Sequence, residues 1–171
     1  MAASFTYKII VGLGNPGKEY KNTYHNAGLL FLDRLVAKNE FKAYKNFEYV
    51  KIGETVVVKP LIFMNESGET VKSALKHFKK EEGDMLVIHD DSDIEFSEYK
   101  LSFGCGSAGH KGIESIIKAL GTKEFARLRI GVRKETKSRR EKAGEFVLKK
   151  MGENDLKVIY SLADKLQKEL L

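Results

Sequence analysis

Residues 7–13 read YKIIVGL, and this apolar run beside glycine predicts a buried strand. Apolar residues recur at helical spacing over residues 27–36, so a helix is expected to follow that strand. Residues 85–89, MLVIH, predict a second buried strand, and residues 98–103 and 127–132 predict two more. Strands that alternate with helices in this way indicate an α/β protein.

A β-hairpin and three further helices complete the expected pattern. Gly121 is well placed to end the second of these helices, and Asn154 is a candidate N-cap for the last. We expect one domain over residues 1–171, an α/β three-layer sandwich whose twisted, mixed and mostly parallel sheet is flanked by helices. The expected elements are a hairpin of residues 47–52 and 55–61, with helices over residues 71–78, 113–120 and 156–163.

Positive charge is concentrated in one stretch of the chain. The net charge is +6, and residues 127–142 hold eight basic residues against two acidic ones, which accounts for the whole surplus. A neutral body with one cationic edge suits a polyanionic partner, although a basic run is often only a solvated loop. No apolar run approaches the ~20 residues that cross a bilayer, the first residues lack a secretory pattern, and the single Cys105 fits a reducing cytosol. We therefore expect a cytoplasmic protein without a membrane segment.

Polar residues gather in four loops at which strands are expected to end. In α/β folds the chemistry lies in loops at the carboxyl ends of the strands. Three of these loops follow residues 13, 61 and 89, and the fourth spans residues 104–112. His25 precedes the first helix, and Asp90 directly follows the strand of residues 85–89. A carboxylate can hold an imidazole N–H and stabilise the imidazolium that forms when histidine takes a proton, so this pair is a candidate general base.

Other interpretations of these loops fit less well. GLGNPG (12–17) matches the dinucleotide-binding pattern G-x-G-x-x-G, but a polar segment follows where a helix must begin. Counted from Asp91, a calcium loop lacks the required glycine and bidentate glutamate. No G-x-S-x-G elbow occurs, and Cys105 has no local signature of an activated thiol. Water activated by His25 is the simpler mechanism, with no cofactor and no metal.

Four sequence blocks occur in order along the chain. They are GLGNPG (12–17) with EY (19–20) and HNAG (25–28), KP (59–60) with FMNESG (63–68), HD (89–90), and GHKG (109–112). Together they resemble the signature blocks of bacterial peptidyl-tRNA hydrolases, and the resemblance covers residues 8 to 151. It implies hydrolysis of the ester bond between a peptide, or an N-blocked aminoacyl group, and the 3′ end of tRNA. The implied partner is peptidyl-tRNA, through its acceptor stem and 3′ CCA end, and we expect a monomer because no extensive apolar interface is indicated.

The resemblance also implies roles for particular residues. His25 would be the general base, and Asp90 would orient it and stabilise its protonated form. Asn15 would lie beside the peptide end and help to distinguish blocked from free aminoacyl groups. The amide of Asn65 is a neutral donor that suits a growing oxyanion. The groove for the peptide and the 3′-terminal adenosine would be lined by Tyr20, Phe63 and Asn65.

Two departures from the family pattern bear on RNA binding. Lys111 stands where the family typically has a substrate-contacting asparagine, so a longer cation is expected there and could reach a phosphate. Ser102 and Phe103 stand where relatives often carry a basic residue for tRNA phosphates. The candidates to bind phosphates in their place are Lys100, Arg133, Arg139 and Arg140.

Three functional hypotheses therefore stand together. The first is a cofactor-free esterase that acts on peptidyl-tRNA. The second is an RNA-binding module of hydrolase-like fold with weak or no catalysis, which Lys111 and Ser102 keep open and the intact His25 and Asp90 disfavour. The third is a dinucleotide-binding enzyme, which depends on the glycine loop alone.

Overall fold

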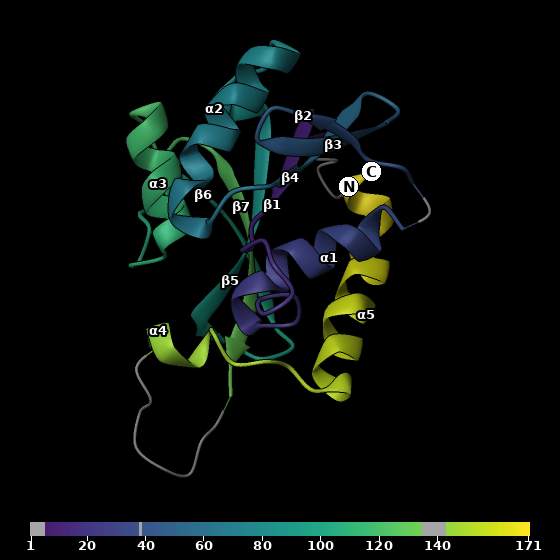
Figure 1. The fold of residues 1–171 in the computed structure, drawn as a ribbon, viewed down its shortest axis with the longest axis vertical. Coiled ribbons are helices and arrows are strands. Elements are labelled where there is room, and N and C mark those ends of the chain that lie inside the picture. The colour runs from purple at the N-terminus through teal and green to yellow at the C-terminus, as the bar shows by residue number, and fades with distance from the viewer. Residues whose placement is uncertain (1–5, 38, 135–142) are drawn as a thin grey trace, which may run out of the picture.

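The computed structural model describes residues 6–37, 39–134 and 143–171, and a seven-stranded sheet forms its centre (Figure 1). The strand order is β2-β3-β4-β1-β5-β7-β6, and the four central strands β4, β1, β5 and β7 are parallel. The antiparallel strands β2 and β3 extend one side, and the antiparallel β6 closes the other. The strands are β1 (Ile9–Gly12), β2 (Lys42–Tyr44), β3 (Phe47–Ile52), β4 (Thr55–Pro60), β5 (Met85–Glu95), β6 (Tyr99–Phe103) and β7 (Ala126–Arg133).

Helices cover both faces of this sheet. Helices α1 (Ala27–Leu35) and α5 (Glu153–Leu170) lie side by side on one face, and α2 (Ser67–Phe78) and α3 (Lys111–Leu120) lie together on the other (Figure 1). The expected three-layer α/β sandwich is therefore confirmed. Short elements complete the chain, namely α4 (Ala143–Phe146), η1 (Tyr24–Asn26), η2 (Met64–Glu66) and η3 (Glu82–Asp84). Within the described ranges, no helix combines the length and apolarity needed to cross a membrane.

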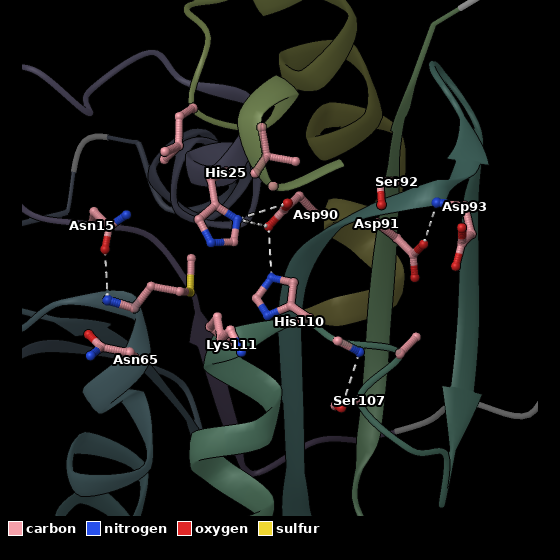
Figure 2. A pocket seen from close by; sticks show the side chains of 16 residues that line it. Asn15, His25, Asn65, Asp90, Asp91, Ser92, Asp93, Ser107, His110 and Lys111 are labelled. Carbon is pink, nitrogen blue, oxygen red and sulfur yellow. Dashed lines mark hydrogen bonds and ion pairs between the residues drawn. The ribbon is translucent and has the colours of Figure 1, made fainter. Parts of the chain in front are cut away.

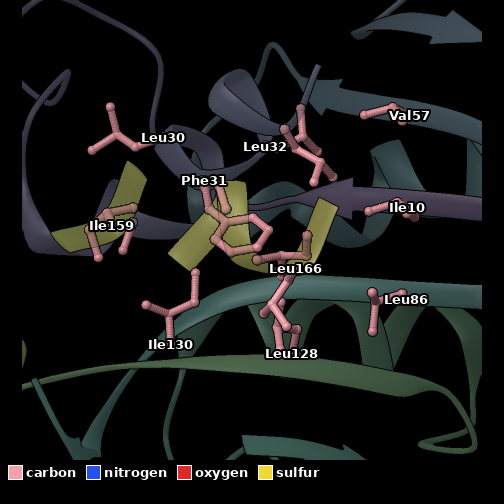
Figure 3. Close-up of a cluster of buried hydrophobic side chains, with 14 of the residues drawn as sticks. Ile10, Leu30, Phe31, Leu32, Val57, Leu86, Leu128, Ile130, Ile159 and Leu166 are labelled. Atoms are coloured by element: carbon pink, nitrogen blue, oxygen red, sulfur yellow. The ribbon is translucent and has the colours of Figure 1, made fainter. Parts of the chain in front are cut away.

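Alternate residues of the central strands supply two separate cores. Ile10 points toward α1 and α5, whereas its neighbours Ile9 and Val11 point toward α2 and α3. In the first core the fully buried Phe31 lies among side chains from the sheet and from α5, including Ile159 (Figure 3). Each such side chain contributes about 1.5–3 kcal/mol by leaving water. These two cores fix the helices against the sheet and so fix the loops that carry the polar residues.

Helix α1 packs against β5 with almost no space between their backbones. A Cβ atom added at Gly28 would lie 2.2 Å from the carbonyl oxygen of Ile88, far inside van der Waals contact. Only glycine permits this approach. The close packing brings the residues just before α1 directly over the strand that carries Asp90.

Two element boundaries differ from the sequence prediction. Strand β5 does not end at His89 but continues to Glu95, because Asp90 and Asp91 pair with β7. Asp90 is therefore a strand residue, with its side chain fixed by the sheet. The predicted N-cap of the last helix was also wrong, since α5 begins after Gly152 and Asn154 lies in its first turn.

The loop of residues 104–110 begins at the opposite edge from the one expected. Strand β6 is antiparallel, so Phe103 lies beside Ala126, at the start of the parallel β7. The loop then runs back along the sheet, where Arg127 Nη2 donates to the Gly106 carbonyl oxygen at 2.9 Å. Because of this return path, the start of α3 still reaches the carboxyl edge of the parallel strands.

Candidate active site

Two histidines contact one buried carboxylate at the carboxyl edge of the sheet (Figure 2). His25 Nδ1 lies 3.0 and 2.9 Å from the two oxygens of Asp90. His110 Nε2 lies 2.9 Å from Asp90 Oδ1. The three side chains come from η1, from β5 and from the residue before α3, so distant parts of the chain meet at this carboxylate.

The backbone around His25 is bonded to the segment that follows α4. The N–H of His25 donates to the carbonyl oxygen of Val147 at 2.7 Å, and that of Tyr24 donates to Lys149 at 3.1 Å. The N–H of Met151 returns a bond to Asn22 at 2.8 Å. This ladder fixes the imidazole of His25 in position relative to the adjoining cleft wall.

Burial and neighbouring imidazoles act in opposite directions on these groups. Burial tends to raise the pKa of Asp90, but the adjacent His110 and His25 outweigh it and hold that pKa well below the usual carboxyl range. Burial tends to lower the pKa of His25, but the charge and hydrogen bond of Asp90 raise it above the ordinary imidazole value. Asp90 is therefore anionic at neutral pH and stabilises a proton on His25.

Asn15 is fixed by three hydrogen bonds that leave its amide NH2 available. Its backbone N–H donates to Asn26 Oδ1 at 2.8 Å, and Asn26 Nδ2 donates to its carbonyl oxygen at 2.9 Å. The side-chain oxygen of Asn15 accepts the backbone N–H of Met64 at 2.7 Å. Figure 2 shows the amide nitrogen of Asn15 on the side that faces His25. A preorganised donor therefore lies beside the imidazole.

These groups line a cleft of about 380 Å³. Asp91 also lines it, but its carboxylate is bound to Arg129 Nε at 2.8 Å. The exposed Asn65 and Lys111 lie at the cleft as well. Its full lining is Asn15, His25, Met64, Asn65, Asp90, Asp91, Ser92, Asp93, Ser107, Ala108, Gly109, His110, Lys111, Gly144, Val147 and Leu148.

The arrangement suits hydrolysis by an activated water. An anionic carboxylate that accepts the Nδ1–H of His25 leaves Nε2 of that ring as the proton acceptor. Among the described residues, no serine, threonine or cysteine side chain hydrogen-bonds to His25 or His110. The same three groups could in geometry hold a metal ion, because one ligand atom from each of His25, Asp90 and His110 lies within 4.8 Å of the others.

The glycine loop does not form a dinucleotide site. A pyrophosphate-binding turn needs a helix that begins at the third glycine. Here Gly17 has a φ of 105°, a sequence of turns follows it, and the next helical residues begin at Tyr24. The loop instead serves to place Asn15.

Comparisons with known proteins agree with this chemistry. A family model described as peptidyl-tRNA hydrolase matches residues 9–171. The peptidyl-tRNA hydrolase of Mycoplasma capricolum is 41% identical over 159 residues, which covers 89% of this chain and 84% of that protein. That of Aquifex aeolicus is 39% identical over 165 residues, covering 92% and 85%. The crystal structure of peptidyl-tRNA hydrolase from Acinetobacter baumannii matches with a TM-score of 0.81 and 29% identity, covering 98% of this chain and 88% of that one.

The chain belongs to the peptidyl-tRNA hydrolase family. It is an ester hydrolase that cleaves the bond between peptide and tRNA, so its substrate is peptidyl-tRNA. The family match over residues 9–171 supersedes the dinucleotide-enzyme hypothesis.

The structure brings together the pair that the sequence singled out. His25 and Asp90 are in direct contact, and Asn15 and Asn65 line the same cleft as this pair. Tyr20 packs edge-on against the half-exposed Phe63, with ring centroids 6.2 Å apart, and neither ring belongs to the lining of this cleft. Their contact with substrate stays a prediction.

Three of the predicted phosphate-binding residues lie in described elements: Lys100 in β6, Lys111 at the start of α3 and Arg133 at the end of β7. The ammonium of Lys111 lies 3.2 Å from Glu114 Oε2. Lys100 is exposed on β6, and Arg133 lies 3.5 Å from Glu95 at the end of β7. Arg139 and Arg140 lie outside the described residues.

Two residues at the site had no role in the sequence analysis. His110 was part of the fourth block, but nothing in its spacing indicated contact with Asp90. Histidine is also not a common N-cap, so its position before α3 gave no signal. Asn26 stands next to His25 in the first block, and only the fold reveals its reciprocal bonds with Asn15.

Proposed function

We propose that His25 is the general base of this hydrolase and that Asp90 orients it. Nε2 of His25 takes a proton from a water molecule as the water oxygen attacks the ester carbonyl carbon. The bond to the terminal ribose oxygen then breaks, and the imidazolium returns the proton to that oxygen. The observation that carries this proposal is the contact of His25 Nδ1 with both oxygens of a buried carboxylate.

Two asparagines are proposed to bind the reacting carbonyl and the peptide. The available amide NH2 of Asn15 lies on the His25 side of the cleft, where it can donate to the peptide end of the substrate (Figure 2). The amide of Asn65, on the same cleft, is proposed to stabilise the oxyanion. Amide groups read the peptide backbone without selecting particular side chains, which suits a broad range of peptides.

The remaining contacts are proposed for the tRNA portion. Tyr20 and Phe63 would support the peptide and the 3′-terminal adenosine, since Phe63 presents an exposed ring. Phosphates of the acceptor stem and the CCA end would meet Lys111, Lys100 and Arg133, with Arg139 and Arg140 in the same basic stretch. A binding module with weak catalysis is the less supported alternative, because binding alone does not require a histidine held by a buried aspartate.

Several broader features belong to the same proposal. One sheet holds every strand of the described ranges, which supports a single functional unit over residues 1–171. We propose a monomer that acts in the cytoplasm, where charged tRNA is found, and that needs neither cofactor nor metal. The proposal that no metal is needed depends on the tautomer of His25. When Nδ1 of His25 carries the proton and donates a hydrogen bond to Asp90, it has no lone pair with which to bind a metal ion.

The decisive experiment is turnover of an N-acetyl-aminoacyl-tRNA by the variant His25→Ala. We expect activity to fall by roughly a thousandfold or more, because general-base catalysis and the orientation of water are lost together. The matched control is His77→Ala, since His77 is an exposed histidine on α2, and it should retain full activity. Undiminished turnover by His25→Ala would refute the assignment of the base.

Two solution measurements extend this test. The raised pKa of His25 means that kcat/KM should rise with pH and level off only above the ordinary imidazole range, since the base must be deprotonated.

Affinity for tRNA should fall steeply with added salt, because cations that bind phosphates release counterions. An affinity for tRNA that does not change with salt concentration would show that the basic residues do not bind phosphates as proposed.

A further inference from the structure

His110 has its proton position fixed by the helix that follows it. Its Nδ1 accepts the backbone N–H groups of Gly112 at 3.1 Å and Ile113 at 3.3 Å, so the side chain is the N-cap of α3. A nitrogen that accepts hydrogen bonds carries no proton, and a neutral imidazole therefore has its proton on Nε2. That Nε2–H points at Asp90 Oδ1, 2.9 Å away.

Protonation of His110 is opposed by the same helix. A second proton would have to be placed on Nδ1, where it would face two N–H donors instead of accepting from them. It would also place a positive charge at the positive end of the α3 dipole. His110 consequently donates one hydrogen bond to Asp90 without taking up a proton itself.

The geometry points to His110 as a positioning residue for the hydrolysis. Because Oδ1 of Asp90 is bound by a donor with a fixed tautomer, the carboxylate is held in the orientation in which it accepts the Nδ1–H of His25. His25 is then held with its proton on Nδ1 and with Nε2 toward the cleft. This inference rests on the proposed role of His25 as the base.

The fixed donor also sets how strongly Asp90 attracts a proton on His25. A hydrogen bond to a carboxylate withdraws part of its negative charge, so Asp90 stabilises the imidazolium of His25 less than an unbound carboxylate would. Without the donor, the pKa of His25 would rise further, and more of the base would be protonated at neutral pH.

Other ionisable groups around the cluster do not replace this donor. His89 is fully buried, and burial holds its pKa well below the ordinary value, so it is neutral. Its Nδ1 lies 2.7 Å from the backbone oxygen of Asp90, away from the carboxylate. Two of the charged groups nearby are already paired, Lys111 with Glu114 and Arg129 with Asp91. The other two are Arg127 and Asp93.

The variant His110→Asn separates the two functions of this side chain. Asparagine is among the best N-caps, so its oxygen can still accept from the start of α3, but the shorter side chain loses the contact with Asp90. His110→Ala loses both functions. We expect His110→Asn to melt closer to the wild type than His110→Ala does, while both variants show the same change in pH profile.

The pH profile of kcat/KM is the informative readout. We expect its acid limb to shift upward by about 0.5–1 pH unit in His110→Asn, with activity recovered at high pH. On that limb the variant should be roughly 3–10-fold less active, because less of His25 is deprotonated. A role in substrate binding would instead raise KM at every pH and leave the limb in place, and that outcome would overturn the inference.

The wild-type protein offers an independent test. The nitrogen-15 chemical shifts of His110 should show a proton on Nε2 and none on Nδ1 at neutral pH. A proton on Nδ1 at that pH would refute the fixed tautomer. Suppose that the wild type is active, that His25→Ala is inactive and that the acid limb of the pH profile is not shifted in His110→Asn. In that case the inference about His110 fails while the proposed base stands. An active His25→Ala would instead refute the proposed base.

Discussion

The substitution Asp90→Asn exchanges one carboxylate oxygen for an amide NH2 at the point where two imidazole N–H groups converge. The new side chain has one acceptor and one donor, whereas His25 and His110 together present two donors. His110 cannot change its tautomer without losing the N-cap of α3, so the asparagine oxygen should turn toward it. The amide NH2 then faces His25 and forces the proton of that ring from Nδ1 to Nε2, which should abolish the proposed function of His25 as a base.

The magnitude follows from the two interactions that are lost. A hydrogen bond to a charged partner contributes about 1.5–3 kcal/mol, and forcing a donor against a donor costs about 1–3 kcal/mol. The sum, roughly 2.5–6 kcal/mol, corresponds to a decrease in kcat of about two to four powers of ten. The assay is single-turnover hydrolysis of an N-acetyl-aminoacyl-tRNA at saturating enzyme, which isolates the chemical step.

Asp90→Ala is the matched comparison. Alanine removes the carboxylate but imposes no tautomer, so His25 can still populate the form with a free Nε2 lone pair. We therefore expect Asp90→Ala to be more active than Asp90→Asn, although it is the larger truncation. An Asp90→Asn enzyme that equals Asp90→Ala, or that keeps more than about a tenth of wild-type kcat, would contradict the predicted tautomer change.

Three further outcomes follow from the site and its support. Asn15→Asp keeps the acceptor for the Met64 N–H but removes the NH2 donor that we propose for the substrate, and steady-state kinetics should show a roughly 100-fold lower kcat, with an unchanged value refuting the proposed contact. Gly28→Ala places a methyl group 2.2 Å from the Ile88 oxygen, so thermal melting should reveal a loss of about 1–3 kcal/mol, and full stability would show that α1 can shift freely. A strong zinc chelator should leave turnover unchanged, since a proton on His110 Nε2 leaves no lone pair there for a metal, and inhibition by the chelator would argue for a bound ion.

The sequence carried most of the information about the fold because burial repeats with a clear period. Ile9, Ile10 and Val11 alternate between two helix-covered faces, and a strand buried on both sides reads as a continuous apolar run. The predicted helices were recognisable by the apolar stripe that each turns toward the sheet. The end of β5 was not recognisable, because Asp90 and Asp91 are polar residues inside a strand, and their pairing with β7 depends on the tertiary fold.

The candidate site was predictable only in part. The ordered blocks singled out His25, Asp90 and Asn15, which the fold assembles at one cleft. The contact of His110 with Asp90 could not be predicted from the sequence, because it depends on a loop that starts at the far edge of the sheet and returns. A sequence gives the order of the residues along the chain but not the path that a loop takes between two strands.

The backbone ladder between residues 22–25 and 147–151 has a consequence for how this hydrolase responds to its substrate. The bond from the N–H of His25 to Val147 couples the position of the imidazole to that of the adjoining cleft wall. We therefore expect a peptide that contacts the exposed Leu148, which lies on that wall, to displace the imidazole of His25 as well. Changes at Leu148 should alter the rate of bond cleavage along with affinity, even though this side chain takes no part in the chemistry.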